Sequence, residues 1–233
     1  MILFGKEITQ TSQPLFVAEI SCNHGGSLQE AKELIHAAKE AGADAVKIQT
    51  YFAEDMTISH RSYVGPQNNY ETTNEFMVNE GPWKGQHLFD LYRKAQTPYE
   101  FVEPMFEYAK ELNISLFSSV FSESGLSLLE DLNCEVYKIA SFENNDINLI
   151  ERVAKTNKPL LISCGTASIE DIIRITEIVN VNNTCLMHCV SKYPHHFVDA
   201  QLQKINFLKG FHPIVVGYSD HCEDWKAMNI AVS

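Results

Sequence analysis

Residues 41–50 read Ala-Gly-Ala-Asp-Ala-Val-Lys-Ile-Gln-Thr, a stretch in which the end of a helix leads into a buried strand. Gly42 stands where a helix commonly ends in the left-handed conformation. The run over 45–50 has the length of a strand and is mostly apolar, with Lys47 and Gln49 as its charged and amide side chains. A helix followed directly by such a strand is half of a repeating α/β unit, so this stretch predicts a parallel sheet flanked by helices.

The same alternation of short apolar runs and helical patterns continues on both sides of this stretch. Ser27 with Glu30 matches a capping box, and Pro98 suits the first position of a helix. We therefore expect one domain over residues 1–233, a (β/α)8 TIM-type barrel that lacks its eighth βα unit. The expected strands lie near residues 15–20, 45–50, 115–119, 135–140, 159–163, 184–190 and 213–218, and the expected helices near 27–41, 98–112, 124–132, 146–155, 168–179, 198–209 and 225–232.

The number of expected strands leaves the barrel open. At 233 residues the chain is slightly shorter than the roughly 250 residues of a typical complete barrel. Two unpaired edge strands would be a liability in solution. We expect the chain to be incomplete at its C-terminus, and the alternatives are that residues 1–11 or a partner cover the gap.

One connection is much longer than the others. Residues 51–85 are polar, with paired Asn and Thr residues, two prolines and little periodicity. Loops of this length within a compact domain are usually functional, and this one follows the second strand on the substrate-binding face of such barrels. It is therefore a candidate lid.

Composition excludes several classes of protein. The formal net charge is −12, with 18 Lys and Arg against 30 Asp and Glu, which argues against a nucleic-acid binder. No secretory signal opens the sequence, and no apolar run is long enough to cross a membrane. The six cysteines include no C-x-x-C pair, so a cytoplasmic chain with reduced thiols is the simplest expectation.

Charged residues within apolar strands mark a candidate site. Glu19 ends one apolar run, and Lys47 and Lys138 each lie inside another. Burial of a charge without a partner is costly. A structural interpretation is that a lysine snorkels from a strand end or pairs with Glu19. Two inward lysines on different strands are better explained by an anionic ligand such as phosphate or carboxylate.

Other polar residues at strand ends are less specific taken singly. Serines 119, 141 and 163 could donate to the same anion, although a serine in such a place is more often a helix cap. His221 lies on the same face as Ser219, and a lone histidine there is more often structural than a metal ligand. Four cysteines also lie near strand ends, but their spacing fits no zinc pattern, and small buried thiols are the better interpretation: Cys22, Cys164, Cys189 and Cys222.

These positions resemble the N-acetylneuraminate (sialic acid) synthase family over essentially the whole chain. The similarity is carried, in this order, by residues 18–25 (Ala-Glu-Ile-Ser-Cys-Asn-His-Gly), 41–50, 137–143 (Tyr-Lys-Ile-Ala-Ser-Phe-Glu), 163–165, 193–194 and 217–221 (Gly-Tyr-Ser-Asp-His). Within the family the chain is most similar to the pseudaminic acid synthase branch, through residues 81–83, 91–92, 97–100 and 141–146.

The resemblance implies a transferase that forms a carbon–carbon bond. Phosphoenolpyruvate would condense with the open-chain aldehyde of an N-acetylated hexosamine-type sugar and release phosphate, giving a nonulosonic acid. A divalent metal, Mn²⁺ with Mg²⁺ or Co²⁺ as alternatives, would polarise the aldehyde oxygen. The resemblance also implies a homodimer for a full-length form.

The resemblance assigns a role to each candidate residue. A catalytic role falls to Glu19, near the aldehyde oxygen or a sugar hydroxyl, and to the phosphoenolpyruvate-binding Lys47 and Lys138. His221 would be one metal ligand. The substrate-binding residues would be Gln49, Ser119, Ser141, Glu143, Ser163, Tyr193 and Ser219.

The sequence departs from the family at several points. A second metal-binding histidine and a C-terminal antifreeze-like domain do not follow, and His195 and His196 stand where the family prefers small residues and proline. The first alternative is therefore a catalytically inactive remnant that binds an anion or a partner. The second is an aldolase-like barrel with a Schiff-base lysine.

Overall fold

A curled sheet of parallel strands forms the centre of the computed structural model, which describes residues 1–59, 61–63, 70–72, 76–81, 83–211 and 213–233. The strand order is β3-β4-β7-β8-β9-β10-β11, so neighbours in sequence are neighbours in space. This is the expected barrel architecture with seven strands in the described chain. The strands are β3 (Val17–Ser21), β4 (Ala45–Thr50), β7 (Ser115–Val120), β8 (Tyr137–Ile139), β9 (Leu160–Ser163), β10 (Thr184–Cys189) and β11 (Val215–Ser219).

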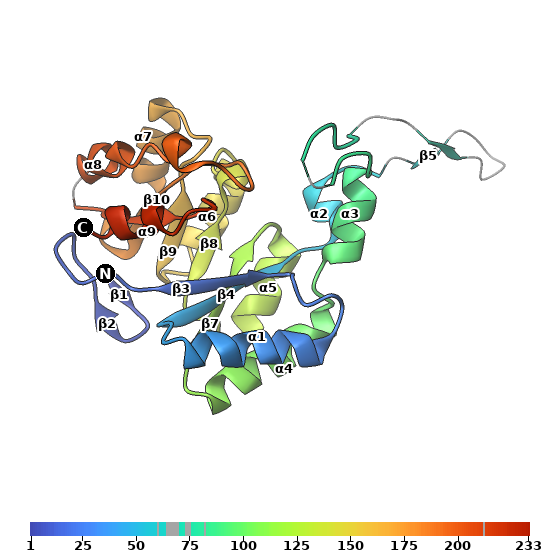
Figure 1. Ribbon diagram of the computed structural model, residues 1–233, viewed down its shortest axis with the longest axis horizontal. Helices are drawn as coiled ribbons and strands as arrows, with labels where there is room; N and C mark the ends of the chain where they lie inside the picture. The colour runs from blue at the N-terminus through green and yellow to red at the C-terminus, as the bar shows by residue number, and fades with distance from the viewer. Residues whose placement is uncertain (60, 64–69, 73–75, 82, 212) are drawn as a thin grey trace.

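Helices follow the strands and cover the outside of the sheet (Figure 1). Helix α1 lies along α4, and both pack against the first strands of the sheet. Ser27 accepts a hydrogen bond from Glu30 N at 3.2 Å as an N-cap, and Gly42 (φ +84°) ends α1 as expected. The helices are α1 (Leu28–Glu40), α4 (Tyr99–Glu111), α5 (Glu123–Asp131), α6 (Ile147–Ala154), α7 (Ile169–Ile178), α8 (Gln203–Lys209) and α9 (Lys226–Ala231).

The interior of the sheet consists of strand residues with apolar side chains. Every residue of β8 and β9 is buried, and β10 is buried except for the half-exposed Met187. A second apolar cluster joins α1, α4 and the first strands through residues such as Ile35, Val46 and Met105, which are fully buried. Such continuous burial is typical of a parallel sheet covered by helices.

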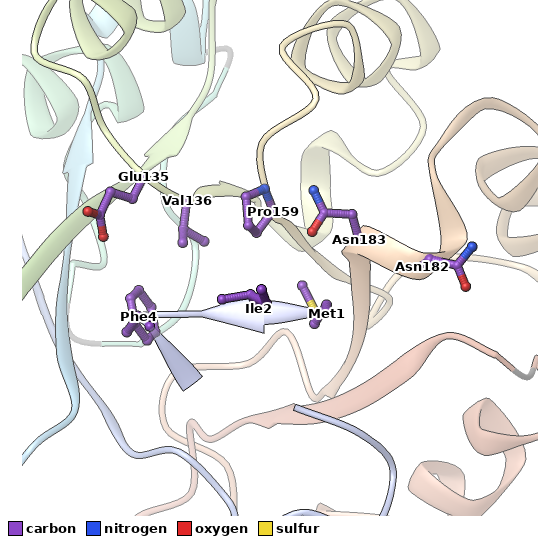
Figure 2. A pocket seen from close by; sticks show the side chains of 9 residues that line it. Met1, Ile2, Phe4, Glu135, Val136, Pro159, Asn182 and Asn183 are labelled. Atoms are coloured by element: carbon purple, nitrogen blue, oxygen red, sulfur yellow. The ribbon is translucent and has the colours of Figure 1, made fainter. Parts of the chain in front are cut away.

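The first residues form a hairpin at the amino ends of the strands. Strands β1 (Ile2–Leu3) and β2 (Lys6–Glu7) pair antiparallel and form a separate sheet. Leu3 joins the main core, and the Phe4 ring lies 5.3 Å from that of Phe117 on β7. A cavity of about 510 Å³ opens beside the hairpin; it is lined in part by Glu135, Val136, Pro159, Asn182 and Asn183, which precede β8, β9 and β10 (Figure 2).

The long connection after β4 contains its own elements. Helices α2 (Ala53–Met56) and α3 (Leu88–Ala95) pack against each other, and β5 (Arg61–Tyr63) pairs with β6 (Tyr70–Thr72). Figure 1 shows α2, α3 and β5 projecting to one side of the barrel. Part of the candidate lid over 51–85 lies outside the described residues, so a lid stays a prediction.

In the described chain, β3 and β11 each have one neighbouring strand. The hairpin of the first residues forms a separate sheet beside the amino ends of the strands and pairs with neither β3 nor β11 among the described residues. Gln10 Nε2 donates to the carbonyl oxygen of Ile214, just before β11, at 2.9 Å. None of the helices in the described residues combines the length and apolarity needed to cross a bilayer.

Candidate functional site

An ion pair links the first two strands of the sheet at their carboxyl ends. Glu19 and Lys47 are register partners on β3 and β4, and their carboxylate and ammonium groups are in contact. Glu19 Oε1 also accepts from the backbone N and the hydroxyl of Ser21, at 2.8 and 2.9 Å. Lys47 Nζ donates to Ser119 Oγ at 3.3 Å. Burial, together with the positive charge of Lys138, lowers the pKa of Lys47, whereas Glu19 opposes both effects.

Lys138 provides a second cation, from β8. Its side chain is buried, and its Nζ donates to Ser163 Oγ at 2.6 Å and to the carbonyl oxygen of Ile139 at 2.8 Å. Burial lowers the pKa of Lys138 to about 8. The described residues give this ammonium no carboxylate in contact. A buried cation held by neutral oxygens is a ready site for an anion.

Backbone and hydroxyl groups meet next to Lys138. Ser141 Oγ accepts from Gly165 N at 3.0 Å and lies 2.8 Å from Cys189 Sγ. Thr166 Oγ1 donates to the Ser141 carbonyl oxygen. Gly165 has no room for a side chain, because a Cβ there would lie 2.4 Å from Ser191 Oγ and 2.5 Å from Cys189 Sγ. The chain is therefore closely packed here, and the Gly165 amide is held against the Ser141 hydroxyl.

Glu143 ends the 3-10 turn η1 (Ser141–Glu143) that follows β8. Its Oε2 is buried and has no hydrogen-bond partner among the described residues. Burial raises the pKa of Glu143, and the charge of Lys138 opposes this. Burial, with a contribution from the Glu143 charge, raises the pKa of Tyr92 and raises that of Tyr193 to about 12. A carboxyl group between two tyrosines suits contact with a polar, uncharged ligand such as a sugar.

His221 follows β11 on the same face as Ser219. Its Nδ1 lies 2.7 Å from the carbonyl oxygen of Val190, which can only accept, so Nδ1 carries the hydrogen. In the neutral ring the lone pair is therefore on Nε2, 3.4 Å from Ser219 Oγ. The Tyr193 ring lies 4.0 Å from that of His221. Burial, with smaller effects from the nearby lysines, lowers the pKa of His221 and favours this neutral form.

These features fit His221 as one ligand of a divalent metal. A ligating histidine usually donates its other N–H to a carbonyl or carboxylate, as His221 does to Val190. The described residues also contain one group of three with ligand atoms within 4.8 Å of one another: His195, Asp220 and Cys222. A possible metal site is thus present near the end of β11.

Of the eleven residues expected from the sequence, Glu19, Lys47 and Lys138 lie in the middle of their strands, and the other eight lie near or after the carboxyl ends of the strands. Direct contacts join them in three groups: Glu19, Lys47 and Ser119; Lys138 and Ser163; and Tyr193, Ser219 and His221. Ser141 lies beside Gly165, and Glu143 interacts electrostatically with Lys138. Gln49 is the register partner of Ser119.

Sequence reasoning missed three residues of this face. Tyr92 comes from α3, a helix that the sequence did not predict, Cys189 ends β10, and Asn144 binds the Ser163 carbonyl oxygen at 3.3 Å. Asn144 and Tyr92 belong to stretches that carry the resemblance, residues 141–146 and 91–92, but no pattern in the sequence indicated a site role for either. The helix of Tyr92 comes shortly after the aperiodic connection over 51–85 and was not expected.

Comparisons with known proteins show the family of this chain. The sequence profile of the NeuB family matches residues 34–233. Pseudaminic acid synthase of Helicobacter pylori is 41% identical over 211 residues, which make up 89% of this chain and 59% of that protein. Pseudaminic acid synthase of Campylobacter jejuni is 37% identical over 227 residues, 96% of this chain and 63% of that protein.

A solved structure shares the fold. The N-acetylneuraminic acid (sialic acid) synthetase of Leptospira borgpetersenii, crystallised with citrate, superposes with a TM-score of 0.79 at 29% identity and covers 94% of this chain and 69% of its own. The chain spans about three fifths of the length of the two curated relatives. With the profile match over 34–233, the resemblance seen in the sequence is confirmed, and the chain belongs to the NeuB family.

Proposed function

We propose that this chain forms the barrel of a phosphoenolpyruvate-condensing synthase that makes a nonulosonic acid of the pseudaminic type. The observation that carries the proposal is a pair of lysines on the barrel strands, the buried Lys138 on β8 and the largely buried Lys47 on β4. Two ammonium groups repel each other and lose solvation on burial, and an anion that carries several charges offsets both costs. Phosphoenolpyruvate has both a phosphate and a carboxylate, so it suits two cations on different strands.

In this proposal the lysines and serines hold phosphoenolpyruvate. Lys138 and Ser163 form one donor pair and Lys47 and Ser119 another, and Ser141 lies beside the first. The enolpyruvate carbon forms a bond to the aldehyde carbon of the sugar. Water then adds to the resulting oxocarbenium carbon, and cleavage of the C–O bond releases inorganic phosphate. Fixed cations stabilise the anionic charge throughout, which is the largest contribution such a site can make.

The acceptor sugar would lie over the remaining polar residues. Glu143 and Gln49 would contact sugar hydroxyl or acetamido groups, and Tyr193 would form part of the pocket wall. Glu19 would move a proton near the aldehyde oxygen once its ion pair with Lys47 is relaxed by the incoming anion. Ser219 would complete the polar lining next to His221.

A divalent cation, Mn²⁺ or in its place Mg²⁺ or Co²⁺, would polarise the aldehyde oxygen when bound. His221 would supply one ligand through Nε2, since Nδ1 is engaged by Val190. Its lowered pKa keeps the ring neutral, as ligation requires.

We further propose a cytoplasmic enzyme that, in a full-length form, is a homodimer. All six cysteines are free, which supports a reducing compartment. The acidic composition argues against nucleic acid as a partner, and we propose that no membrane is involved.

The binding of phosphoenolpyruvate tests the proposal directly. Isothermal titration calorimetry on the chain should give saturable binding, and Lys47→Ala and Lys138→Ala should each weaken it by about tenfold or more, since a charge-assisted hydrogen bond contributes ~1.5–3 kcal/mol. Lys110→Ala, an exposed lysine in the last turn of α4, should bind normally. Equal affinity in all four proteins would contradict the assignment.

Turnover is the second test. Phosphate release from phosphoenolpyruvate with Mn²⁺ and a panel of N-acetylated hexosamines should depend on the acceptor. If phosphoenolpyruvate binds but no acceptor supports release, the anion-binding remnant is the better description of this chain. A borohydride-stable adduct on a lysine would instead indicate the aldolase alternative.

A further inference from the structure

Three potential metal ligands meet at the end of β11 without a role in the proposed synthase. The ligand atoms of His195, Asp220 and Cys222 all lie within 4.8 Å of one another. His195 is 1% exposed, and its Nε2 has no hydrogen-bond partner in the described part of the chain. A buried polar atom without a partner is costly, and a bound ligand would supply the missing partner.

The hydrogen bonds of the three side chains leave one ligand atom available on each. His195 Nδ1 lies 3.0 Å from the His196 carbonyl oxygen, so the hydrogen is on Nδ1 and the lone pair on Nε2. Asp220 Oδ1 accepts from the Tyr218 hydroxyl at 2.8 Å and from Cys222 N at 2.9 Å, and neither donor engages Oδ2. Cys222 Sγ accepts from Asp224 N at 3.4 Å and is available as a sulfur ligand.

The backbone holds the ligands in place from two segments. His195 and Cys222 form an isolated parallel bridge. His195 N donates to the His221 carbonyl oxygen at 3.1 Å, and Glu223 N donates to that of His195 at 3.3 Å. The ligand spacing in sequence fits no zinc pattern because the ligands come from the loops after two neighbouring strands.

This group lies on the other face of the chain from His221. His221 points toward Ser219 and the Val190 carbonyl oxygen. Asp220 instead binds the hydroxyl of Tyr218, whose ring stacks on His188 of β10, the residue bonded to the Ala200 carbonyl oxygen outside the barrel. Successive residues of an extended chain alternate in direction, so Asp220 and Cys222 face away from the candidate active site.

We infer that His195, Asp220 and Cys222 form a second metal site, behind the candidate active site, for a zinc-type divalent cation. One nitrogen, one oxygen and one sulfur ligand suit Zn²⁺, with water or another group in the fourth position. The ion would join the segment that carries Tyr193 to the segment that carries His221. It would thereby hold two residues of the proposed sugar and metal pocket from behind.

Cobalt substitution tests the inference on the whole chain. In metal-free protein, kept reduced, one equivalent of the bound Co²⁺ should give a thiolate-to-cobalt charge-transfer band, and Zn²⁺ should displace that equivalent. Cys222→Ser should abolish the band. Loss of a residue that only supports a metal ligand weakens metal binding by roughly tenfold to hundredfold. His195→Gln and Asp220→Asn should each weaken Co²⁺ binding by more than this.

Two control variants separate this site from its surroundings. His196→Gln removes the exposed pair between His196 and Glu223 (2.5 Å) and should leave the band unchanged. His221→Asn removes the ligand proposed for the catalytic metal and should also leave it unchanged. Circular dichroism of the metal-free variants checks that each remains folded.

The results distinguish this site from the proposed activity. A band that persists in Cys222→Ser, a band lost in His221→Asn, or stoichiometric cobalt without a thiolate band would overturn the inference. If phosphoenolpyruvate does not bind but the cobalt results are as expected, the synthase proposal is contradicted and the second metal site is supported.

Discussion

At the scale of single residues, Lys138 makes ligand binding sensitive to pH. Burial lowers its pKa to about 8, and a bound anion would stabilise the charged form and raise that pKa. The affinity for phosphoenolpyruvate should therefore fall as the pH rises through about 8, with proton uptake on binding. Calorimetry at pH 7 and pH 9 in buffers of different ionisation enthalpy measures both. Lys138→Arg, which stays charged, should show no such fall. If the affinity of this variant depended on pH in the same way as that of the unmodified protein, Lys138 would not be the group that titrates.

At Gly165, the neighbouring side chains leave no space for any residue other than glycine. A Cβ at this position would lie 2.4–2.8 Å from three polar side-chain atoms, those of Ser191, Cys189 and Ser141. Gly165→Ala should lower the free energy of unfolding by about 1–3 kcal/mol, the usual cost of overpacking. Gly125→Ala, inside α5 where a Cβ meets nothing closer than 3.4 Å, should be neutral or slightly stabilising. Urea denaturation of both variants makes the comparison, and equal stabilities would contradict it.

The site residues could be located from sequence, whereas most of their partners could not. Glu19, Lys47 and Lys138 were recognisable because each interrupts an apolar strand, and strand alternation predicts that they share one face. The contact of Ser141 with Gly165 depends on a tight turn after β9 that carries no periodic signal. The pairing of His195 with Cys222 depends on which loops lie side by side, which a single sequence does not specify.

At the scale of elements, the cap of α1 makes a separable contribution. Ser27 Oγ accepts from Glu30 N at 3.2 Å, but Ser27 N donates to the His24 carbonyl oxygen at 2.9 Å, so the expected capping box is only half formed. Ser27→Ala should cost ~1 kcal/mol of stability. Ser127→Ala removes an exposed hydroxyl that donates within α5 and should change stability by less than about 0.5 kcal/mol. Thermal unfolding, followed by circular dichroism, measures the stability of both variants. Equal losses of stability would mean that the Ser27 cap does not stabilise α1.

The elements that were predicted well are those with strong periodicity on both sides. The strand over 45–50 has the expected bounds, whereas α8 begins only at Gln203 instead of 198. The reason is a 3-10 turn over Phe197–Asp199 followed by Gln201 with φ +47°, which interrupts a continuous helix. Helix α3 was missed because its eight residues are a short segment between the aperiodic connection over 51–85 and the expected helix that begins near 98.

At the scale of the whole molecule, function and stability lie at opposite ends of the barrel. The candidate site lies toward the carboxyl ends of the strands, and the hairpin of β1 and β2, with the cavity beside it, lies at the amino ends. Alternating βα units in the sequence predicted the barrel and the functional end. The place of the hairpin was not predictable, because two-residue strands carry no pattern and their position depends on the assembled core.

This separation predicts that the two ends respond differently to mutation. Leu3 is 7% exposed in the main core, and Ile2 beside it is 63% exposed. Leu3→Ala should lower the free energy of unfolding by about 2–3 kcal/mol, the lower part of the range for a buried leucine, and Ile2→Ala should have little effect. Phosphoenolpyruvate affinity of the folded protein should be unchanged in both, because the hairpin lies beside the residues that precede β8, β9 and β10. Lys138→Met should show the reverse, with weakened binding and a stability that does not fall, since an apolar side chain of similar length replaces a buried charge that has no carboxylate in contact among the described residues. Urea denaturation and calorimetry on the same samples separate the two effects, and a parallel loss of binding in Leu3→Ala would mean that the two ends of the barrel are coupled.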